Sequence, residues 1–350
     1  MDMGFWQIVS VILLVVFFYV YSLLDGFDLG IGMLLPFLGD KEESHRLKSV
    51  IAPVWDGNEV WLVMGAAYLF GAFPLAYARL LSALYLPFTA AIAAFVLRAA
   101  SIEFSYHDEN RPRLWKNLFG GASFAASALG LAAIGFAVQG LPFSGPGILS
   151  SSIGDYLSPF PFLFGILGAG AVAWHGIAYA IARMPSPTLS RLALRTWPIV
   201  CAVCVMAAVL GIVFVPAVRA KPLVWIGGFV FFLGLACGRA FLFRQSSAFW
   251  CSCVSITGVW ISVAGAVFPY ALPARGYTTL GITFAQAAAP DSSLRVLNSI
   301  ALVIVPVIIG YMFFVYRVLR KQYTNPLFGA APDSRELQGP PDREQARGVA

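Results

Sequence analysis

Long runs of apolar residues, separated by short polar connections, cover most of this 350-residue chain. Runs of roughly 20 residues are long enough for an α-helix to cross the hydrocarbon core of a bilayer. The pattern predicts an all-α bundle of nine transmembrane helices within residues 1–321, followed by a disordered tail over residues 322–350. The nine predicted spans are residues 5–24, 60–78, 80–104, 118–138, 160–182, 197–215, 223–243, 248–270 and 296–316.

The second and third predicted spans follow each other almost directly. Residues 73–79 must therefore form a tight hairpin, and Pro74 suits the end of a helix there. The two longest outer connections, residues 140–159 and 271–294, are rich in Gly, Pro, Ser and Thr and show no pattern of a folded domain.

Composition and charge agree with a membrane protein and predict its orientation. Hydrophobic residues make up 59% of the chain, charged residues 11%, and the mean hydropathy is +0.79, which excludes a soluble globule. With nine spans, about 17 of the 23 Lys and Arg residues fall on one side. The N-terminus is therefore predicted to be periplasmic and the C-terminus cytoplasmic. The pI of 9.1 reflects this orientation rather than nucleic-acid binding.

Polar side chains gather at the predicted cytoplasmic ends of the first three spans. A carboxylate at membrane depth costs several kcal/mol unless it is neutralised, paired or hydrated, so such groups are functional candidates. We expect them to form a proton pathway at the inner surface. The candidates are Asp25, Asp28, Asp56, Asn58, Glu59, Arg98 and Glu103.

The segment after the first run has two distinct helical faces. At 100° per residue, Asp25, Asp28 and Gly32 share one face, and Gly26 and Gly30 form another. Small residues four positions apart allow another helix to approach closely in a membrane bundle. The sequence therefore predicts one acidic face and one helix-packing face.

Structural roles are the alternatives for these residues. Asp56 and Glu59 follow Pro53 and could cap a helix, since a capping box and the helix dipole both favour acids there. Arg98 could extend to the interface or neutralise an acid, and Trp61 could belong to an interfacial aromatic belt with Trp55. Capping leaves Asp25, Asp28 and Arg98 unexplained.

Histidine and cysteine offer little support for a metal site. His175 is the single histidine within a predicted span, and a lone histidine is more often a hydrogen-bonded packing residue than a haem ligand. Cys201 and Cys204 form a Cys-x-x-Cys pair without a second pair or a partner histidine nearby. We interpret the cysteines as small apolar residues and predict that this chain binds no metal.

Two motifs carry a family resemblance. Asp25-Gly-Phe-Asp-Leu-Gly-Ile-Gly32 is followed by Ala52-Pro-Val-Trp-Asp-Gly-Asn-Glu-Val-Trp-Leu62, and then by Phe73-Pro74 with Tyr77-Ala78. In order and spacing the chain resembles subunit II of the cytochrome bd quinol oxidases. The resemblance extends in outline over all nine spans, including Phe268-Pro269 and the span with Pro306.

The resemblance implies a haem-free subunit of a respiratory enzyme in the bacterial cytoplasmic membrane. Its partner would be a larger subunit I that carries two haems b, one haem d and the site for ubiquinol or menaquinol. A small single-helix accessory subunit is left open as a further partner. The resemblance also implies that Asp28 and Asp56 belong to a cytoplasmic proton path and that Trp61 lies beside an oxygen path.

The chain departs from the family pattern at two places. After Arg98 the run reads Glu103-Phe104-Ser105-Tyr106, without the second arginine that is usual in the family. The outer connection over residues 216–222 is short and resembles the cyanide-insensitive branch. A secondary transporter with a buried acid–arginine site is the alternative, although paired Gly- or Pro-broken helices in two halves would then be expected.

Overall fold

The structure is a computed structural model that describes residues 3–324, except residues 40, 109, 151–153, 155–156, 216–217, 220, 243, 245 and 278. The predicted tail lies outside this range from residue 325 onwards, and its first three residues, 322–324, belong to a helix. The short connection over residues 216–222 also lies partly outside the described residues. Residues 1–295 form one compact unit, and a second unit starts at Val296 within α12.

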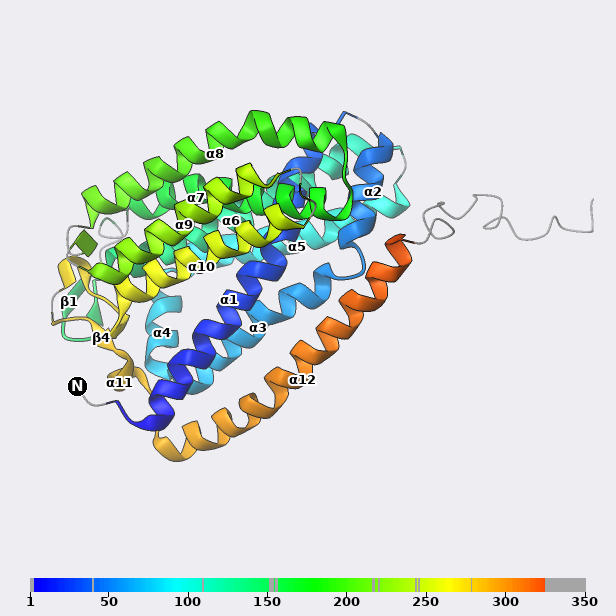
Figure 1. Ribbon diagram of the computed structural model, residues 1–350. Coiled ribbons are helices and arrows are strands. Elements are labelled where there is room, and N and C mark those ends of the chain that lie inside the picture. The colour runs from blue at the N-terminus through cyan, green and yellow to red at the C-terminus, as the bar shows by residue number, and fades with distance from the viewer. Residues whose placement is uncertain are drawn as a thin grey trace, which may run out of the picture. The chain divides into compact units, whose positions relative to one another are not determined.

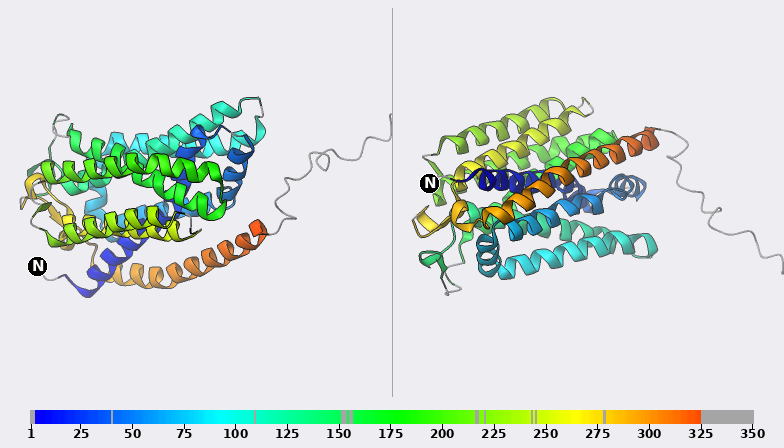
Figure 2. Two further views of the ribbon diagram at one scale, coloured as in Figure 1. Left: turned by 45° about the horizontal axis from the view of Figure 1, so that its top comes forward. Right: turned by 90° about the horizontal axis from the view of Figure 1, so that it is seen from below.

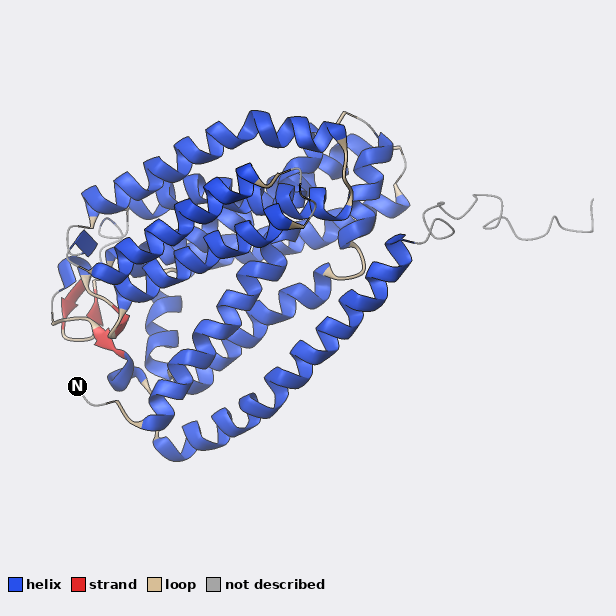
Figure 3. Cartoon of the chain, viewed as in Figure 1, coloured by secondary structure: helices blue, strands red, loops and turns tan. Residues whose placement is uncertain are grey.

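Helices dominate the described part of the chain (Figure 1, Figure 3). Eight of them are long and apolar enough to cross a membrane, and the bent pair of α3 and α4 gives a ninth candidate. This arrangement confirms the predicted all-α polytopic bundle. The candidate spans are α1 (Phe5–Leu34), α3 (Trp55–Ala72) with α4 (Pro74–Ala83), α5 (Tyr85–His107), α6 (Pro112–Gln139), α7 (Pro159–Arg183), α8 (Pro187–Phe214), α9 (Pro222–Ala240), α10 (Ser247–Val267) and α12 (Asp291–Thr324).

The break between α3 and α4 corrects the boundaries predicted for the second and third spans. The chain bends by 119° between the two helices, at Phe73. The predicted span 60–78 therefore runs across two elements. Pro74 opens α4 at its first position rather than ending a helix. A proline fits there because the N–H groups of a first turn have no partner within the helix, so the absence of one costs nothing. Proline also disfavours helical geometry in the residue before it, here Phe73. Predicted span 80–104 accordingly starts later, at Tyr85.

Helix α1 is the central element of the first unit. It contacts α3, α6 and α7 most extensively, and Figure 2 shows it among these helices from two further directions. The helix is longer than the predicted span 5–24, because it continues to Leu34. Every residue from Asp25 to Leu34 is buried, so this last third of α1 lies in protein on all sides. It is the part that carries the acidic residues and the closely spaced glycines.

Short elements cover the ends of the bundle. Two antiparallel hairpins, β1 (Phe143–Gly145) with β2 (Ile148–Leu149) and β3 (Tyr270–Leu272) with β4 (Ile282–Thr283), gather near the end where α1 begins (Figure 3). An isolated bridge between Leu141 and Ala274 joins the two outer connections. The sequence pattern gave no indication of this pairing. The remaining elements are η1 (Leu35–Phe37), α2 (Lys41–Ile51), η4 (Arg275–Tyr277) and α11 (Phe284–Ala287).

Candidate functional site: a buried acid–arginine cluster

Polar side chains from α1, α3 and α5 meet in the interior of the first unit. Asp25 and Asp28 of α1, Asn58 of α3 and Arg98 of α5 are each 0% exposed. Glu59, also from α3, keeps 23% of its side chain exposed. We call these five residues the acid–arginine cluster. Because three separate helices contribute, the cluster depends on the packing of the whole bundle.

Arg98 forms the centre of this cluster. One terminal nitrogen, Nη2, donates to Asp25 Oδ1 at 2.7 Å, and the other, Nη1, donates to Glu59 Oε1 at 2.5 Å. The planar guanidinium fork suits such a bridge, since charge-assisted hydrogen bonds to two carboxylates fix its orientation. Arg98 thereby connects α5 to both α1 and α3. Its complete burial shows that the side chain does not extend to the interface.

Asp28 is held differently from Asp25. Asn58 Nδ2 donates to Asp28 Oδ2 at 2.7 Å, and no cation among the described residues forms an ion pair with Asp28. Asp28 Oδ1 and Asp25 Oδ2 are buried without a hydrogen-bond partner in the described structure. Arg98 is therefore the one cation in a cluster of three carboxylates, and it pairs with Asp25 and Glu59 but not with Asp28.

Asp56 and Glu103 lie apart from the buried residues. Both are exposed, and neither forms an ion pair within the described part of the chain. Asp56 occupies the first turn of α3, where it interacts electrostatically with Glu59. The structure thus brings together Asp25, Asp28 and Glu59 of the five predicted carboxylates and leaves the other two at the surface.

The side-chain capping interpretation of Asp56 and Glu59 is wrong. Val54 is the N-cap residue of α3 and no side chain caps this helix. Glu59 instead uses its carboxylate to accept from Arg98. The belt interpretation of Trp61 is also wrong, because Trp61 is only 1% exposed and packs beside Phe17, with ring centroids 6.2 Å apart. A belt residue would face the interface.

Gly26 and Gly30 face α7 of the same chain. A Cβ atom at Gly30 would lie 2.3 Å from the Val172 carbonyl oxygen and 2.7 Å from the backbone of Gly176. The two backbones can approach this closely because both positions lack a side chain. Gly32, two turns beyond Asp25 on the same continuous helix, meets α6 rather than the cluster, and a Cβ atom there would be 2.1 Å from Ser123 Oγ.

His175 is a packing residue on this second side of α1. Its Nδ1 lies 2.8 Å from Ser252 Oγ and its Nε2 lies 3.0 Å from the Leu23 carbonyl oxygen. The ring also stacks on Phe249 at a centroid distance of 5.2 Å. Both ring nitrogens are engaged, so His175 does not fit an axial haem ligand. The other two histidines, His45 and His107, are exposed and do not fit a buried haem either.

Sequence reasoning missed one neighbour of the cluster. Tyr21 interacts with the Asp25 carboxylate from one turn earlier on α1. The spacing of four residues could have revealed it, since residues at i and i+4 are neighbours on a helix surface. Tyr21 adds a hydroxyl group beside the buried acids.

The fold and the cluster define a polytopic helical membrane protein with buried charges at the centre of its bundle. A family model described as "Cytochrome bd terminal oxidase subunit II" matches residues 6–319. The chain belongs to this family, and the secondary-transporter interpretation loses its support.

Similar proteins agree with this assignment. "Cytochrome bd ubiquinol oxidase subunit 2" of Bacillus subtilis strain 168 is 27% identical over 91% of this chain and 96% of the relative. "Cytochrome bd-I ubiquinol oxidase subunit 2" of Escherichia coli K12 is 27% identical over 89% of this chain and 92% of the relative. The fold resembles a chain of the bd oxidase from Geobacillus thermodenitrificans, with a TM-score of 0.74, 17% identity, and 90% and 99% of the two chains covered.

Proposed function

We propose that this chain is the haem-free subunit II of a respiratory bd-type oxidase that couples quinol oxidation to the reduction of oxygen to water. In this proposal the acid–arginine cluster helps to deliver protons to a haem-bearing subunit I. The observation that carries the proton role is the excess of three clustered carboxylates over one buried guanidinium, which pairs with Asp25 and Glu59 and leaves Asp28 to Asn58. The family and its relatives support the wider assignment.

Charge balance explains why the cluster would hold protons. If Asp25, Asp28 and Glu59 were all ionised, Arg98 would leave two negative charges uncompensated. An uncompensated buried ion costs several kcal/mol, so uptake of protons is the cheapest way to neutralise the excess. The free oxygens Asp25 Oδ2 and Asp28 Oδ1 are positions where a proton can be held. A group that binds a proton reversibly inside a membrane protein can also pass it on.

The exposure of the carboxylates suggests a route. Asp56 is exposed, the Glu59 side chain is 23% exposed, and Asp25 and Asp28 are fully buried. Asp56 would take up protons at the predicted cytoplasmic surface, and Glu59 would connect it to the buried acids. Reduction of oxygen to water consumes protons, which cannot cross hydrocarbon unaided.

The cofactors would belong to the partner subunit. Two haems b and one haem d in subunit I would carry electrons from ubiquinol or menaquinol to oxygen. The positions of the three histidines in this chain are consistent with that division, since His175 has both ring nitrogens engaged. The family resemblance implies that Trp61 would border an oxygen path; its indole is buried and lies beside Phe17.

The test compares Asp28→Asn and Asp56→Asn in the complete oxidase complex. Both substitutions keep the approximate shape of the side chain but cannot transfer a proton in the same way. A positioned proton-transfer group contributes about 100-fold or more, so Asp28→Asn should slow quinol-dependent oxygen uptake by about that factor. Asp56→Asn should slow it by about tenfold, since water can still reach Glu59 at the surface. Haem content should stay normal in both.

Glu103→Gln is the matched control, because Glu103 is an exposed carboxylate outside the cluster. Oxygen uptake per haem should stay at the wild-type level in this variant. Normal turnover of Asp28→Asn and Asp56→Asn, with only a loss of stability, would show that the acids are structural. The assignment to subunit II is tested separately, by recovery of haem bands only when this chain co-purifies with a larger partner.

A further inference from the structure

The ion pair between Arg98 and Glu59 has one partner that is sealed from solvent and one that is not. Arg98 Nη1 donates to Glu59 Oε1 at 2.5 Å, yet the Arg98 side chain is 0% exposed and the Glu59 side chain is 23% exposed. Dissolved salt screens exposed charges and has much less effect on buried ones. The group that shields the guanidinium therefore determines how firmly this pair holds.

Trp55 lies against the guanidinium. The Arg98 Cζ atom is positioned over the indole ring, 6.0 Å from the ring centroid. Trp55 precedes Glu59 by four residues on α3, so the two side chains are neighbours on one helix face and both meet Arg98. An indole excludes water through its apolar body and attracts a cation through the negative charge of its ring face. The proposed proton route does not use this residue.

The turn between α2 and α3 fixes the position of Trp55. Val54 is 5% exposed and Ile51 is 1% exposed, and the Val54 N–H donates to the Ile51 carbonyl oxygen at 2.9 Å. Trp55 then opens α3, and the N–H of Asn58, a member of the acid–arginine cluster, donates to the Val54 carbonyl oxygen at 3.0 Å. The buried turn therefore holds the indole in register with the cluster.

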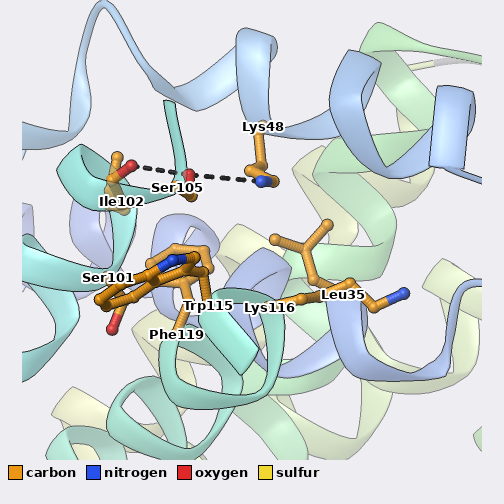
Figure 4. Close-up of a pocket in the computed structure, with 8 residues that line it drawn as sticks. All are labelled: Leu35, Lys48, Ser101, Ile102, Ser105, Trp115, Lys116 and Phe119. Carbon is orange, nitrogen blue, oxygen red and sulfur yellow. Dashed lines mark hydrogen bonds between the residues drawn. The ribbon is translucent and has the colours of Figure 1, made fainter. Parts of the chain in front are cut away.

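A place in an interfacial aromatic belt is the alternative role, since tryptophan is enriched at that level of a membrane. Trp115, near the start of α6, is half-buried like Trp55 and lies where α5 and α6 meet (Figure 4). It donates its indole N–H to Asp108 Oδ2 at 3.1 Å and contacts Phe104 at a centroid distance of 5.5 Å. These contacts involve no member of the acid–arginine cluster, so Trp115 provides the reference for a belt role.

We propose that Trp55 is a positioning residue, which covers the Arg98 guanidinium and holds it on Asp25 and Glu59. Water and dissolved anions at the surface then reach Glu59 but do not compete for Arg98. The consequence for turnover rests on the proposed proton role of the cluster. With Arg98 held in place, Glu59 is the member of the cluster that exchanges protons with surface water.

The experiment measures the thermal midpoint of the complete oxidase complex at increasing salt concentration. Between about 0.1 M and 1 M sodium chloride the screening length falls from about 10 Å to about 3 Å. The midpoint of Trp55→Ala should fall more steeply with salt than that of wild type, because salt then screens the Arg98–Glu59 pair. Trp55→Phe keeps an aromatic face and should retain the wild-type slope. Trp115→Ala should lower the midpoint equally at all salt concentrations.

A double variant assigns the salt effect to the ion pair. Trp55→Ala/Glu59→Gln lacks the pair, so the additional slope of Trp55→Ala should disappear in it when Glu59→Gln is the reference. If Trp55→Ala yields no complex, Trp55→Val carries the test, because its smaller side chain also uncovers the guanidinium. A salt slope for the Trp55 variant equal to that of Trp115→Ala would overturn the proposal.

Oxygen uptake per haem over the same salt range separates this proposal from the proton role. We expect uptake by Trp55→Ala to decrease as salt rises, whereas wild type and Trp55→Phe keep a common salt profile. A steeper midpoint slope with the wild-type uptake profile would support the cover over Arg98 and contradict the proton role of the cluster. An unchanged midpoint slope overturns the cover whatever the uptake shows.

Discussion

The two sides of the last third of α1, from Asp25 to Leu34, are equally buried but differ in how their polar groups are satisfied. On the charged side, Asp25 and Asp28 leave one carboxylate oxygen each without a partner in the described structure. On the packed side, His175 engages both ring nitrogens, and Gly30 meets the backbone of α7 directly. Both sides arise from residues of one short segment of helix.

This difference separates a structural polar group from a functional candidate. Buried polar groups are nearly always hydrogen-bonded in native proteins, so His175 requires no role beyond packing. An excess of carboxylates over cations lowers stability, and its retention calls for a function that uses the charge or the proton. Substitutions on the two sides should therefore affect different measurements, stability on the packed side and turnover on the charged side.

The largest effect is expected from Arg98→Gln on the charged side. Removal of one partner from a buried ion pair costs about 3–5 kcal/mol, because the remaining charges stay buried without compensation. We expect little recoverable complex, measured as haem content after purification. Arg98→Lys keeps the charge but cannot bridge two carboxylates with a fork, so its recovery should be intermediate. Full recovery of Arg98→Gln would show that the cluster does not depend on a cation.

On the packed side, Gly30→Ala should be the most damaging change. The new Cβ atom would lie 2.3 Å from the Val172 carbonyl oxygen, which is backbone and cannot rotate away. Overpacking of this kind costs about 1–3 kcal/mol, and we expect a value near the upper end, measured as a lower thermal midpoint of the complex. Gly130→Ala in α6 is the control, since nothing lies within 4 Å of a Cβ atom there. A thermal midpoint for Gly30→Ala equal to that of the control would contradict close packing of α1 on α7.

A smaller effect is expected from His175→Leu. The substitution leaves the Leu23 carbonyl group and the Ser252 hydroxyl without their histidine partner, at a cost of about 1–2 kcal/mol. The thermal midpoint should fall, while oxygen uptake per haem should remain at the wild-type level. Asp28→Asn should show the reverse pattern. A strong loss of turnover with normal stability in His175→Leu would contradict the purely structural role of the packed side.

The smallest effect concerns the pH dependence of stability at Lys48 in α2, outside the buried segment of α1. Because burial and Lys116 lower the pKa of Lys48 in the folded chain, the unfolded chain binds the proton more tightly. In detergent without anionic lipid, the free energy of unfolding should rise with pH from the lowered pKa towards the ordinary lysine value of 10.5. Lys48→Gln should lose this rise in pH-dependent thermal midpoints. An identical pH profile for the variant would contradict a lowered pKa of Lys48 in the folded chain.

The sequence by itself determined the class of the protein and the elements that carry the site. Apolar runs long enough to span a bilayer predicted the helices. In lipid a single segment can satisfy all of its backbone hydrogen bonds only as an α-helix. Asp25, Asp28 and Arg98 stood out because charges inside such runs are costly. The spacing of Gly26 and Gly30 likewise predicted a close helix contact. All of these inferences use properties of one helix and its solvent.

Only the tertiary structure decided which groups meet. Helical periodicity places Asp25 and Asp28 on one face, but it does not say that Arg98 joins Asp25 to Glu59 or that Asn58 donates to Asp28. It also places Gly32 on the face of the acids, but it does not say that α6 is the neighbour at Gly32. The reason is physical: periodicity fixes directions around one helix, whereas the neighbour in each direction is chosen by the packing of residues distant in the chain.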